Sequence, residues 1–506
     1  MTDFAPAAPQ AASNRAKYMT LIAAFLGWMF DGFEQALFPL IGQPALTELL
    51  GPSAQPNDSA KWFGAIIAVF LVGAASGGVL FGWLGDKIGR VRAMSLSILT
   101  YAVFTGLCGF ATEAWHIAAL RFVASLGMGG EWSLGVALVN EIWPGKSRAM
   151  TAGLIGASAN FGYLFVAMLS MAMLSFITGL ENFLLGIGIS EALTTKLLAN
   201  SGWRFLMIVG ALPAVMVFFI RLFVPESEKW KHERDRGATS HWANVDLIGV
   251  LIGMCGGMVI IWAWSPAGVS GLPATLITVA GLAVAMGGFM HPVRHYLRRA
   301  EAAQSLPAGS RRSIIRLMLF GAGISAVALL GTWGTVLWAP RWVSQLEPDA
   351  AKHAKEWTLI WMSIGAIAGT MVAALCAGRF GRRITYCVLC VASIASVVLF
   401  YQVNTGYGSL FLPTVFLAGG ITAAFYGFFP LYLPELFPTA VRATAQGFSY
   451  NFGRIVAAIG GLQTATLIGF FGGSFANAGS AMAVIYVVGI VLIWFGPETK
   501  GRELPA

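Results

Sequence analysis

The sequence is divided into apolar runs long enough to cross a membrane, and this division constrains the fold more than any other feature. An α-helix needs roughly 20 apolar residues to span the hydrocarbon core, and in lipid only helices and closed barrels satisfy their own backbone. With 57% hydrophobic and 11% charged residues, the composition agrees. We therefore expect an all-α polytopic membrane protein with fourteen spans, at about 18–41, 61–84, 91–112, 115–139, 149–178, 203–224, 245–265, 272–290, 316–340, 357–378, 384–404, 410–433, 443–470 and 475–496.

A repeated motif divides these spans into two sets of six. The pattern E-x2-P-x3-R-A-x3-G starts at Glu141 and again at Glu435, which indicates a duplicated half. A weaker match sets Gly82-x2-Gly85-Asp86-x2-Gly89-Arg90 against 378–383, and there Gly378 stands in the place of Asp86. The predicted division is an N-terminal tail at 1–17, a six-helix bundle at 18–224, a central segment with two extra spans at 225–315, a second six-helix bundle at 316–496 and a tail at 497–506.

The basic residues give the orientation. Most of the 32 Lys and Arg residues fall in alternate loops, so the positive-inside rule places both termini in the cytoplasm. The net charge of +9 therefore reflects orientation and predicts no nucleic-acid partner. All five cysteines lie in predicted spans, which argues against a disulfide framework or a zinc site. We expect no metal and no cofactor.

Five charged residues lie inside predicted spans and away from their ends, where a charge is costly unless it is paired or hydrated. Asp31 and Glu34 are spaced i, i+3 and share one face of the first span, whereas Glu131 lies in the fourth. Because no histidine is well placed within a span, we expect these three carboxylates to carry the coupled proton. Glu131 equally fits a cytoplasmic polar network.

The two intramembrane arginines are candidate substrate-binding residues. Arg121 lies at about the depth of Glu34, so the two would form either a permanent ion pair or one that protonation switches. Arg454 lies near mid-depth in the second set of six spans, which holds no acid, and it would bind a substrate carboxylate, or else backbone carbonyl groups, Glu131 or Asp31 across the cavity. Trp333 and Trp338 fit stacking on a sugar-like ring, but they fit packing or the membrane interface better. Uncharged candidates, which would bind a polyol in the cavity or simply join helices, are Asn160, Tyr163, Tyr426, Tyr450, Asn451 and Gln463.

Several motifs resemble those of a known superfamily. GWLGDKIGR at 82–90 resembles the signature loop of the major facilitator superfamily, and VPES at 224–227 and GPETKG at 496–501 resemble motifs that close the two halves of sugar porters. DGFE at 31–34, RFVASLGMGGEW at 121–132 and EIWPGKSRA at 141–149 are similar to organic-acid:proton symporters, most of all to the sialic acid permease group, which also has two extra central spans.

The resemblance implies two pseudo-symmetric bundles that work by alternating access. It also implies a network of charges that closes the cytoplasmic side, although the same residues fit loop solvation and orientation. Its expected members are Asp86, Arg90, Glu141, Arg148, Arg382, Glu435 and Arg442, with Glu226 and Glu498 added by the resemblance.

The predicted function is proton-coupled symport of a small organic anion, either a monocarboxylate or an acidic sugar such as sialic acid, across the plasma (inner) membrane. A neutral-sugar carrier of the same fold is the first alternative, and a membrane nutrient sensor is the second. The sequence offers no nucleophile with a matching base, so we do not expect an enzyme. No obligate protein partner is indicated.

Overall fold

The computed structural model is built from helices, with no strand in the part of the chain that it describes. That part comprises residues 13–52, 58–143, 147–213, 216, 219–220, 223–264, 268–269, 271–307, 309–346 and 353–505. Residues 1–12 of the predicted tail and 144–146 of the first repeat motif lie outside it.

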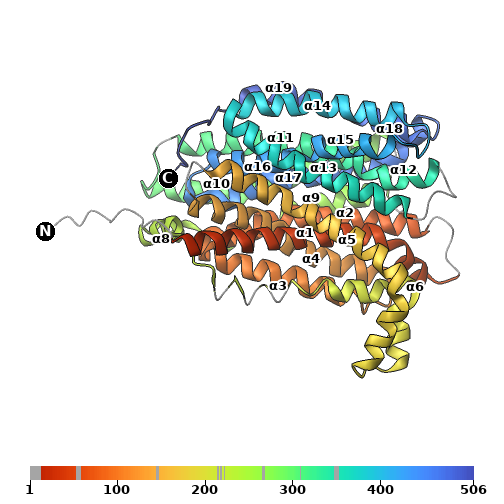
Figure 1. Ribbon diagram of the computed structural model, residues 1–506. Coiled ribbons are helices and arrows are strands. Elements are labelled where there is room, and N and C mark those ends of the chain that lie inside the picture. The colour runs from red at the N-terminus through yellow and green to blue at the C-terminus, as the bar shows by residue number, and fades with distance from the viewer. Residues whose placement is uncertain are drawn as a thin grey trace.

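The first half of the chain forms one group of helices (Figure 1). Ser13 starts this group by accepting a hydrogen bond from the backbone N–H of Ala16, which caps the first helix. The group comprises α1 (Asn14–Leu50), α2 (Asp58–Ile88), α3 (Arg90–Cys108), α4 (Ala114–Ile142), α5 (Arg148–Gly186) and α6 (Glu191–Val209). The short helix α8 (Glu228–Asp235) follows at the end of the molecule where the chain begins.

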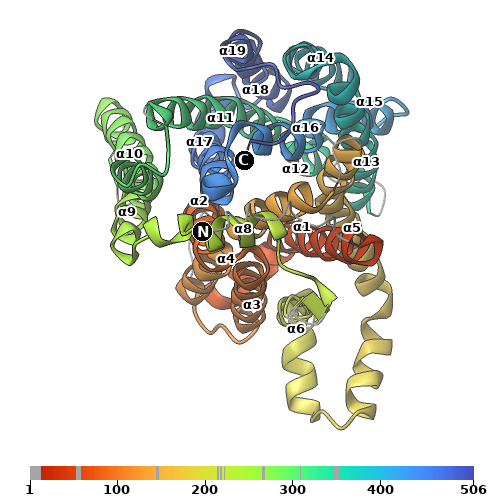
Figure 2. The same cartoon turned by 90° about the vertical axis from the view of Figure 1, so that its left-hand side faces the viewer.

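The second half forms the other group, and both chain ends lie at the same end of the molecule (Figure 1). Its helices are α11 (Ser310–Gly334), α12 (Ala339–Leu346), α13 (Ala354–Phe380), α14 (Arg382–Val403), α15 (Phe411–Ala423), α16 (Phe425–Tyr432), α17 (Arg442–Phe470), α18 (Phe475–Met482) and α19 (Ile485–Leu492). Between the halves in sequence come α9 (Leu247–Ala263) and α10 (Leu272–Ala302), which pair with each other at the side of the molecule (Figure 2).

The two halves meet along two seams. In the first, α2 packs against α17, and in the second, α5 packs against α13 and α16. The inserted pair α9 and α10 contacts α2 and α17 and so lies beside the first seam (Figure 2). Glycines make the first seam close, because a Cβ at Gly447 would lie 2.3 Å from the carbonyl oxygen of Gly78. Small residues of this kind let membrane helices approach closely.

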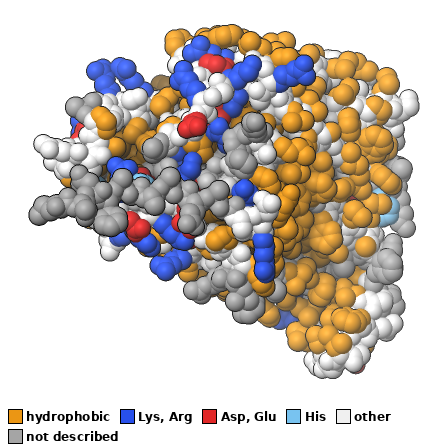
Figure 3. All heavy atoms as spheres, turned by 60° about the vertical axis from the view of Figure 1, so that its left-hand side comes forward, with side chains coloured by type: hydrophobic (Ala, Val, Ile, Leu, Met, Phe, Trp, Pro, Cys, Tyr) orange, Lys and Arg blue, Asp and Glu red, His pale blue; other side chains and the backbone are white. Residues whose placement is uncertain are grey.

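Twelve described helical segments are long and apolar enough to cross a membrane. Hydrophobic side chains cover the flank of the molecule, and Lys and Arg gather toward the end where the chain begins (Figure 3). The protein is therefore a multi-pass, all-α membrane protein. Two predicted spans are not among the twelve: 203–224, which is only partly described, and 443–470, which corresponds to α17. The count of fourteen spans stays a prediction.

The connection between the fifth and sixth predicted spans differs from the expected extramembrane loop. α5 has 39 residues and would measure about 58 Å, which exceeds the thickness of a bilayer. Its last turns and the start of α6 form a helical hairpin that projects from the bundle (Figure 2). The backbone of α6 leaves the helical conformation at Ala199–Gly202 before the predicted span begins. The predicted end of the fifth span at residue 178 therefore does not mark the end of its helix.

Candidate functional site

A small cavity of about 60 Å³ lies between the two halves. Ligand sites of small molecules commonly enclose 300–1,000 Å³, so a substrate would have to widen this cavity. Four predicted uncharged candidates and the predicted Arg454 line it, namely Asn160, Tyr163, Tyr426, Tyr450 and Arg454. The lining also includes Trp28, Gln35, Thr332, Trp333 and Ser363. The cavity thus combines aromatic faces, amides, hydroxyls and one cation.

The cation is held by a long ion pair across the halves. Nη2 of Arg454 in α17 lies 3.9 Å from Oδ2 of Asp31 in α1, and both side chains are buried. The side-chain amide of Gln35 donates to the same carboxylate oxygen at 3.2 Å. Within the described part of the chain, neither Nη1 of Arg454 nor Oδ1 of Asp31 has a partner with hydrogen-bond geometry, although the Trp28 side chain lies close enough to interact with the Asp31 carboxylate. Native proteins rarely leave a buried donor such as Nη1 unpaired.

A second intramembrane pair lies in the first half and is enclosed by protein. Nη1 of Arg121 lies 2.8 Å from Oε1 of Glu34, and the hydroxyl of Thr105 donates to that oxygen at 3.3 Å. The guanidinium carbon lies 4.7 Å from the ring centre of Phe38 and 4.6 Å from that of Phe70. Arg121 does not line the cavity. The predicted meeting of Glu34 and Arg121 is thus present, whereas its switching remains a hypothesis.

Glu131 forms no ion pair in the described part of the chain, but Asp31 lies near enough to act on it electrostatically. A Cβ at Gly27 would lie 1.7 Å from Oε1 of Glu131, so the glycine in α1 makes room for this carboxylate. Neither carboxylate oxygen has a hydrogen-bond partner among the described residues, and the phenol of Tyr101 is nearby. Of the two acids considered as partners of Arg454, the structure brings Asp31 to it and leaves Glu131 without an arginine.

Two other predicted cavity residues lie elsewhere. The amide of Asn451 donates to the carbonyl groups of Gly129 at 3.2 Å and Gly447 at 3.0 Å, so it joins α17 to α4. One residue along a helix turns a side chain by about 100°, which takes Asn451 away from the cavity that Tyr450 lines. Gln463 does not line the cavity either.

Among the polar and tryptophan side chains of the lining, sequence reasoning missed four: Trp28, Gln35, Thr332 and Ser363. Trp28 and Gln35 lie three residues before and four residues after Asp31, and helical spacing places all three on one face. That spacing could have identified both. The sequence around Thr332 and Ser363 gave no such signal, because no intramembrane charged residue lies in the same predicted span.

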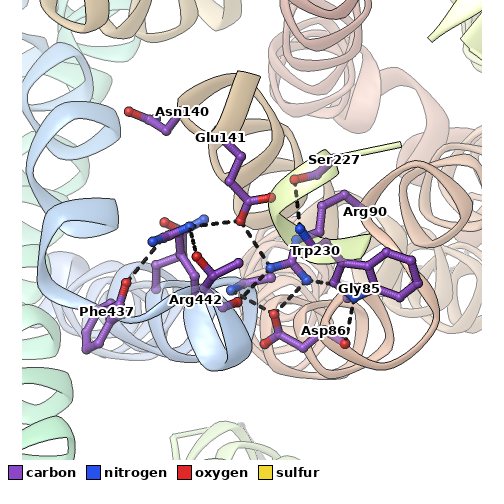
Figure 4. Close-up of polar contacts among 12 residues, drawn as sticks. Gly85, Asp86, Arg90, Asn140, Glu141, Ser227, Trp230, Phe437 and Arg442 are labelled. Carbon is purple, nitrogen blue, oxygen red and sulfur yellow. Dashed lines mark hydrogen bonds and ion pairs between the residues drawn. The ribbon is translucent and has the colours of Figure 1, made fainter. Parts of the chain in front are cut away.

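The predicted cytoplasmic residues form two ion-pair networks that join the halves and are together called the ring below. Figure 4 shows the network around Glu141. Arg90 contacts Asp86 at 2.8 Å and Glu141 at 3.1 Å, and Glu141 contacts Arg442 of the other half at 3.0 Å. All four side chains are inaccessible to solvent.

The two copies of the repeat motif form equivalent ion pairs across the halves. Glu141 pairs with Arg442, and Glu435 pairs with Arg148 at 3.4 Å, so each motif copy supplies an acid to the arginine of the other. Glu435 also holds Arg382 at 2.6 Å. These cross-pairs hold together the ends of the two halves predicted to face the cytoplasm.

Asp86 also caps a helix of the opposite half. Its carboxylate accepts the backbone N–H groups of Ala443 at 3.2 Å and Thr444 at 2.8 Å, in the first turn of α17. The hydroxyl of Thr444 adds a third bond at 2.6 Å. An anion at a helix N-terminus satisfies free donors and is favoured by the helix dipole. Gly378, at the matching place in α13, faces Ala149 of α5 instead, since a Cβ there would lie 3.0 Å from the Ala149 Cβ.

The two closing motifs supply matching caps. Glu226 accepts the N–H of Arg90 at 2.9 Å at the start of α3, and Glu498 accepts the N–H of Arg382 at 2.9 Å at the start of α14. Gly89, with φ of +113°, makes room for the first cap, because a Cβ there would lie 2.3 Å from Oε2 of Glu226.

The two caps differ in acidity. Burial raises the pKa of Glu226 above its ordinary value. Burial also acts to raise the pKa of Glu498, but the backbone N–H groups of Arg382, Arg383 and Lys500 outweigh it and hold that pKa below its ordinary value.

Comparison with known proteins assigns the family. The family model described as sugar (and other) transporter matches residues 19–244 and 349–506. The chain belongs to the sugar (and other) transporter family. It is accordingly a transporter of the major facilitator superfamily and not an enzyme.

Relatives and solved structures agree with this membership. The chain is 25% identical to the cis,cis-muconate transport protein of Acinetobacter baylyi over 95% of each protein, and 26% identical to the sialic acid transporter NanX of Escherichia coli over 44% of this chain and 47% of that one. The solved structure of the proton:xylose symporter XylE bound to 6-bromo-6-deoxy-D-glucose matches with a TM-score of 0.67 at 17% identity, over 97% of this chain and 98% of that one. The fold of this transporter family is therefore shared along nearly the whole chain.

Proposed function

We propose that this transporter carries a small organic anion together with a proton, and that Arg454 binds the anion while Asp31 carries the proton. The observation that supports this most is the buried 3.9 Å pair of Arg454 and Asp31 at the cavity, in which one nitrogen and one oxygen have no partner with hydrogen-bond geometry in the described part of the chain. A substrate carboxylate would replace Asp31 as the partner of Arg454 once Asp31 is protonated. The relatives named for muconate and sialic acid transport support an acidic substrate.

Charge balance explains how binding would be coupled. In the empty site Arg454 and Asp31 neutralise each other, and in the loaded site the substrate anion neutralises Arg454 beside a protonated Asp31. An anion without its proton, or a proton without its anion, leaves an uncompensated charge in a low dielectric, which opposes closure around the site. Both permitted states are neutral, so the transporter moves only when it is empty or fully loaded. Glu131 is a second proton site in this proposal.

We also propose a location, an orientation and a driving force for the transporter. The transporter lies in a bacterial inner membrane with both termini in the cytoplasm, is driven by the proton gradient without a cofactor, and works as a single chain of two six-helix bundles. The cross-paired ring supports closure on the cytoplasmic side while the cavity takes up substrate.

Uptake into liposomes containing the purified protein tests the assignment. Labelled sialic acid, lactate and an aromatic acid are offered with an inward proton gradient. Arg454→Gln is expected to abolish saturable anion binding, and Asp31→Asn is expected to retain exchange of internal for external substrate but to lose gradient-driven accumulation. The matched control is Arg341→Gln, which removes the same charge from an exposed arginine outside the cavity. Accumulation by Asp31→Asn equal to the unmodified protein would rule out this coupling.

A neutral sugar is the second candidate substrate. The cavity favours it through Trp28, Trp333 and Gln35, which suit the faces and hydroxyl groups of a sugar ring. Saturable glucose uptake that organic acids do not compete with, unchanged in Arg454→Gln, would establish this candidate in place of the first.

A further inference from the structure

A second cavity, on the flank of the molecule, has a strongly basic wall. It lies between α10 and α11 and has a volume of about 630 Å³. The basic residues that line it are His291, Arg294, His295, Arg298, Arg311, Arg312 and Arg316. This basic cavity is separate from the cavity of Arg454, with which it shares no lining residue.

Helical spacing explains how the charges converge. In α10, residues 291, 294, 295 and 298 follow the i, i+3, i+4, i+7 spacing of one helix face. In α11, Arg312 and Arg316 are four residues apart and also share a face. Because α10 and α11 contact each other, the two basic faces border one space.

Most of these arginines have no acidic partner. Arg311 pairs with Glu301 at 3.7 Å. In the described part of the chain, no carboxylate forms an ion pair with Arg294, Arg298, Arg312 or Arg316. The neighbouring Arg299 shows the contrast, because Asp246 binds its guanidinium with both carboxylate oxygens. Like charges that border one space repel, so these four exposed arginines without an acidic partner favour an anion between them.

The depth of the cavity places it at the membrane surface. The uncharged part of α10, Leu272 to Met290, has 19 residues and so measures about 28 Å, close to the thickness of the hydrocarbon core. His291 therefore begins the level at which lipid phosphate groups lie. Arg316 ends the basic stretch of α11 just before its own apolar run.

A metal ion is the competing ligand. Asp246, His291 and His295 bring three possible ligand atoms within 4.8 Å of one another. The carboxylate of Asp246 is already engaged by Arg299, and two further arginines border the same histidines on α10. A cation would be repelled by this surrounding charge.

We propose that the basic cavity binds the phosphate headgroup of an anionic phospholipid from the cytoplasmic leaflet. Arginine suits this ligand because its planar fork binds phosphate oxygens bidentately. Basic pockets between membrane helices on the cytoplasmic side bind lipid headgroups of this kind. Since α9 and α10 pack beside the first seam, the lipid joins the inserted pair to the second half.

Native mass spectrometry of the full-length protein in detergent tests the proposal by titration with phosphatidylglycerol, cardiolipin or phosphatidylcholine. Arg312→Gln/Arg316→Gln is expected to weaken binding of the anionic lipids by about 30-fold, at roughly fivefold for each arginine. The matched control, Arg234→Gln/Arg236→Gln, removes the same charge from two exposed arginines at the end of α8, which pair with Asp235 and Glu233. It is expected to bind the lipids within about twofold of the unmodified protein, because neither arginine lines the cavity.

Three outcomes would overturn the proposal. If phosphatidylcholine binds as tightly as the anionic lipids, the headgroup charge plays no part in binding. If Arg312→Gln/Arg316→Gln and Arg234→Gln/Arg236→Gln lose the same lipid affinity, the cavity is not the binding site. Pyrophosphate binding as tightly as the lipids, and displacing them, would assign the arginines to a soluble phosphate ligand instead. If Arg312→Gln/Arg316→Gln fails to fold, Arg294→Gln/Arg298→Gln on the opposite wall provides the same measurement.

Discussion

The two seams between the halves occupy equivalent places in the duplicated fold but are built differently. At the first, Asp86 of α2 crosses to cap α17, and Gly78 and Gly447 bring the two backbones together. At the second, α13 has Gly378 in the place of Asp86, and it packs on Ala149 of α5 without an acid. The inserted helices α9 and α10 lie beside the first seam only, within the part of the chain described.

This difference shows which features duplication preserves and which it leaves free. Both halves retain the cross-paired acid and arginine of the repeat motif, so the ring is symmetric. The additional cap is not duplicated, and we expect the first seam to be the stronger closure. Opening toward the cytoplasm would then be limited by release of Asp86 from α17.

Asp86→Ala should have the largest effect, since it removes the cap and the 2.8 Å partner of the buried Arg90. Breaking a buried pair in this way costs about 3–5 kcal/mol. Spin labels at the exposed positions Arg92 and Arg379 would report a longer distance across the cytoplasmic side, and the thermal unfolding midpoint would fall. Asp86→Asn, which keeps an acceptor oxygen for the cap, should lower the unfolding midpoint less than Asp86→Ala does. An unchanged distance distribution in Asp86→Ala would contradict a role in closure.

The motif glycines provide a matched pair of substitutions. Gly447→Ala places a Cβ 2.3 Å from a backbone oxygen of the first seam, whereas the equivalent Gly153→Ala meets Sδ of Met371 at 3.0 Å and the Met371 Cα and Ala374 Cβ at 3.2 Å. Overpacking should destabilise the Gly447 variant by about 1–3 kcal/mol, while the wider contacts at Gly153 need shifts of only a few tenths of an ångström. Denaturant or thermal unfolding of both variants measures the difference. Equal losses of stability in the two variants would mean that the helices are packed equally closely at both seams.

Gly378→Asp should make the second seam more like the first. Its added carboxylate lies beside Ala149, in the first turn of α5, where a negative charge is worth about 0.3–1 kcal/mol. The same pair of spin labels should show more of the shorter, cytoplasm-closed distance, and uptake should slow about two- to fivefold. A shift toward the open distance would show that the contact with Ala149 dominates.

The caps of α3 and α14 should respond oppositely to pH. Because the folded pKa of Glu498 is lowered, its stabilisation is present above its unfolded pKa and is lost as the pH falls through the folded value. The folded pKa of Glu226 is raised, so its stabilisation is present at low pH and is lost as the pH rises. Glu498→Gln should therefore lower the unfolding midpoint more than Glu226→Gln at pH 7.5, and the difference should narrow at pH 4. If the difference in unfolding midpoint between the two variants is the same at pH 7.5 and pH 4, the opposite pKa shifts of Glu226 and Glu498 are wrong.

The sequence predicted the fold class and the ring because both depend on local or repeated patterns. Apolar runs locate helices, and the two copies of one motif identify the residues of the cross-pairs before their partners are known. The meeting of Glu34 and Arg121 followed from matching depths. In contrast, the choice of Asp31 over Glu131 by Arg454 depends on how α1 and α4 rotate, which depth alone does not determine.

Two further features lay beyond sequence reasoning for physical reasons. Asn451 and Tyr450 are adjacent polar residues, and only the packing of α17 decides that one lines the cavity and the other joins helices. The absence of an acid at Gly378 was visible in the sequence, but the cap that Asp86 provides to α17 required the tertiary arrangement.

The aromatic contact behind the cavity gives this protein an internal optical signal. Trp132 of α4 and Tyr450 of α17 are stacked with ring centres 3.8 Å apart and planes at 12°, and they belong to opposite halves. Any motion that separates α4 from α17 unstacks an indole from a phenol and changes its fluorescence. Subtracting the spectrum of Trp132→Phe isolates this indole from the other tryptophans, so the unlabelled protein can be followed through its cycle in real time.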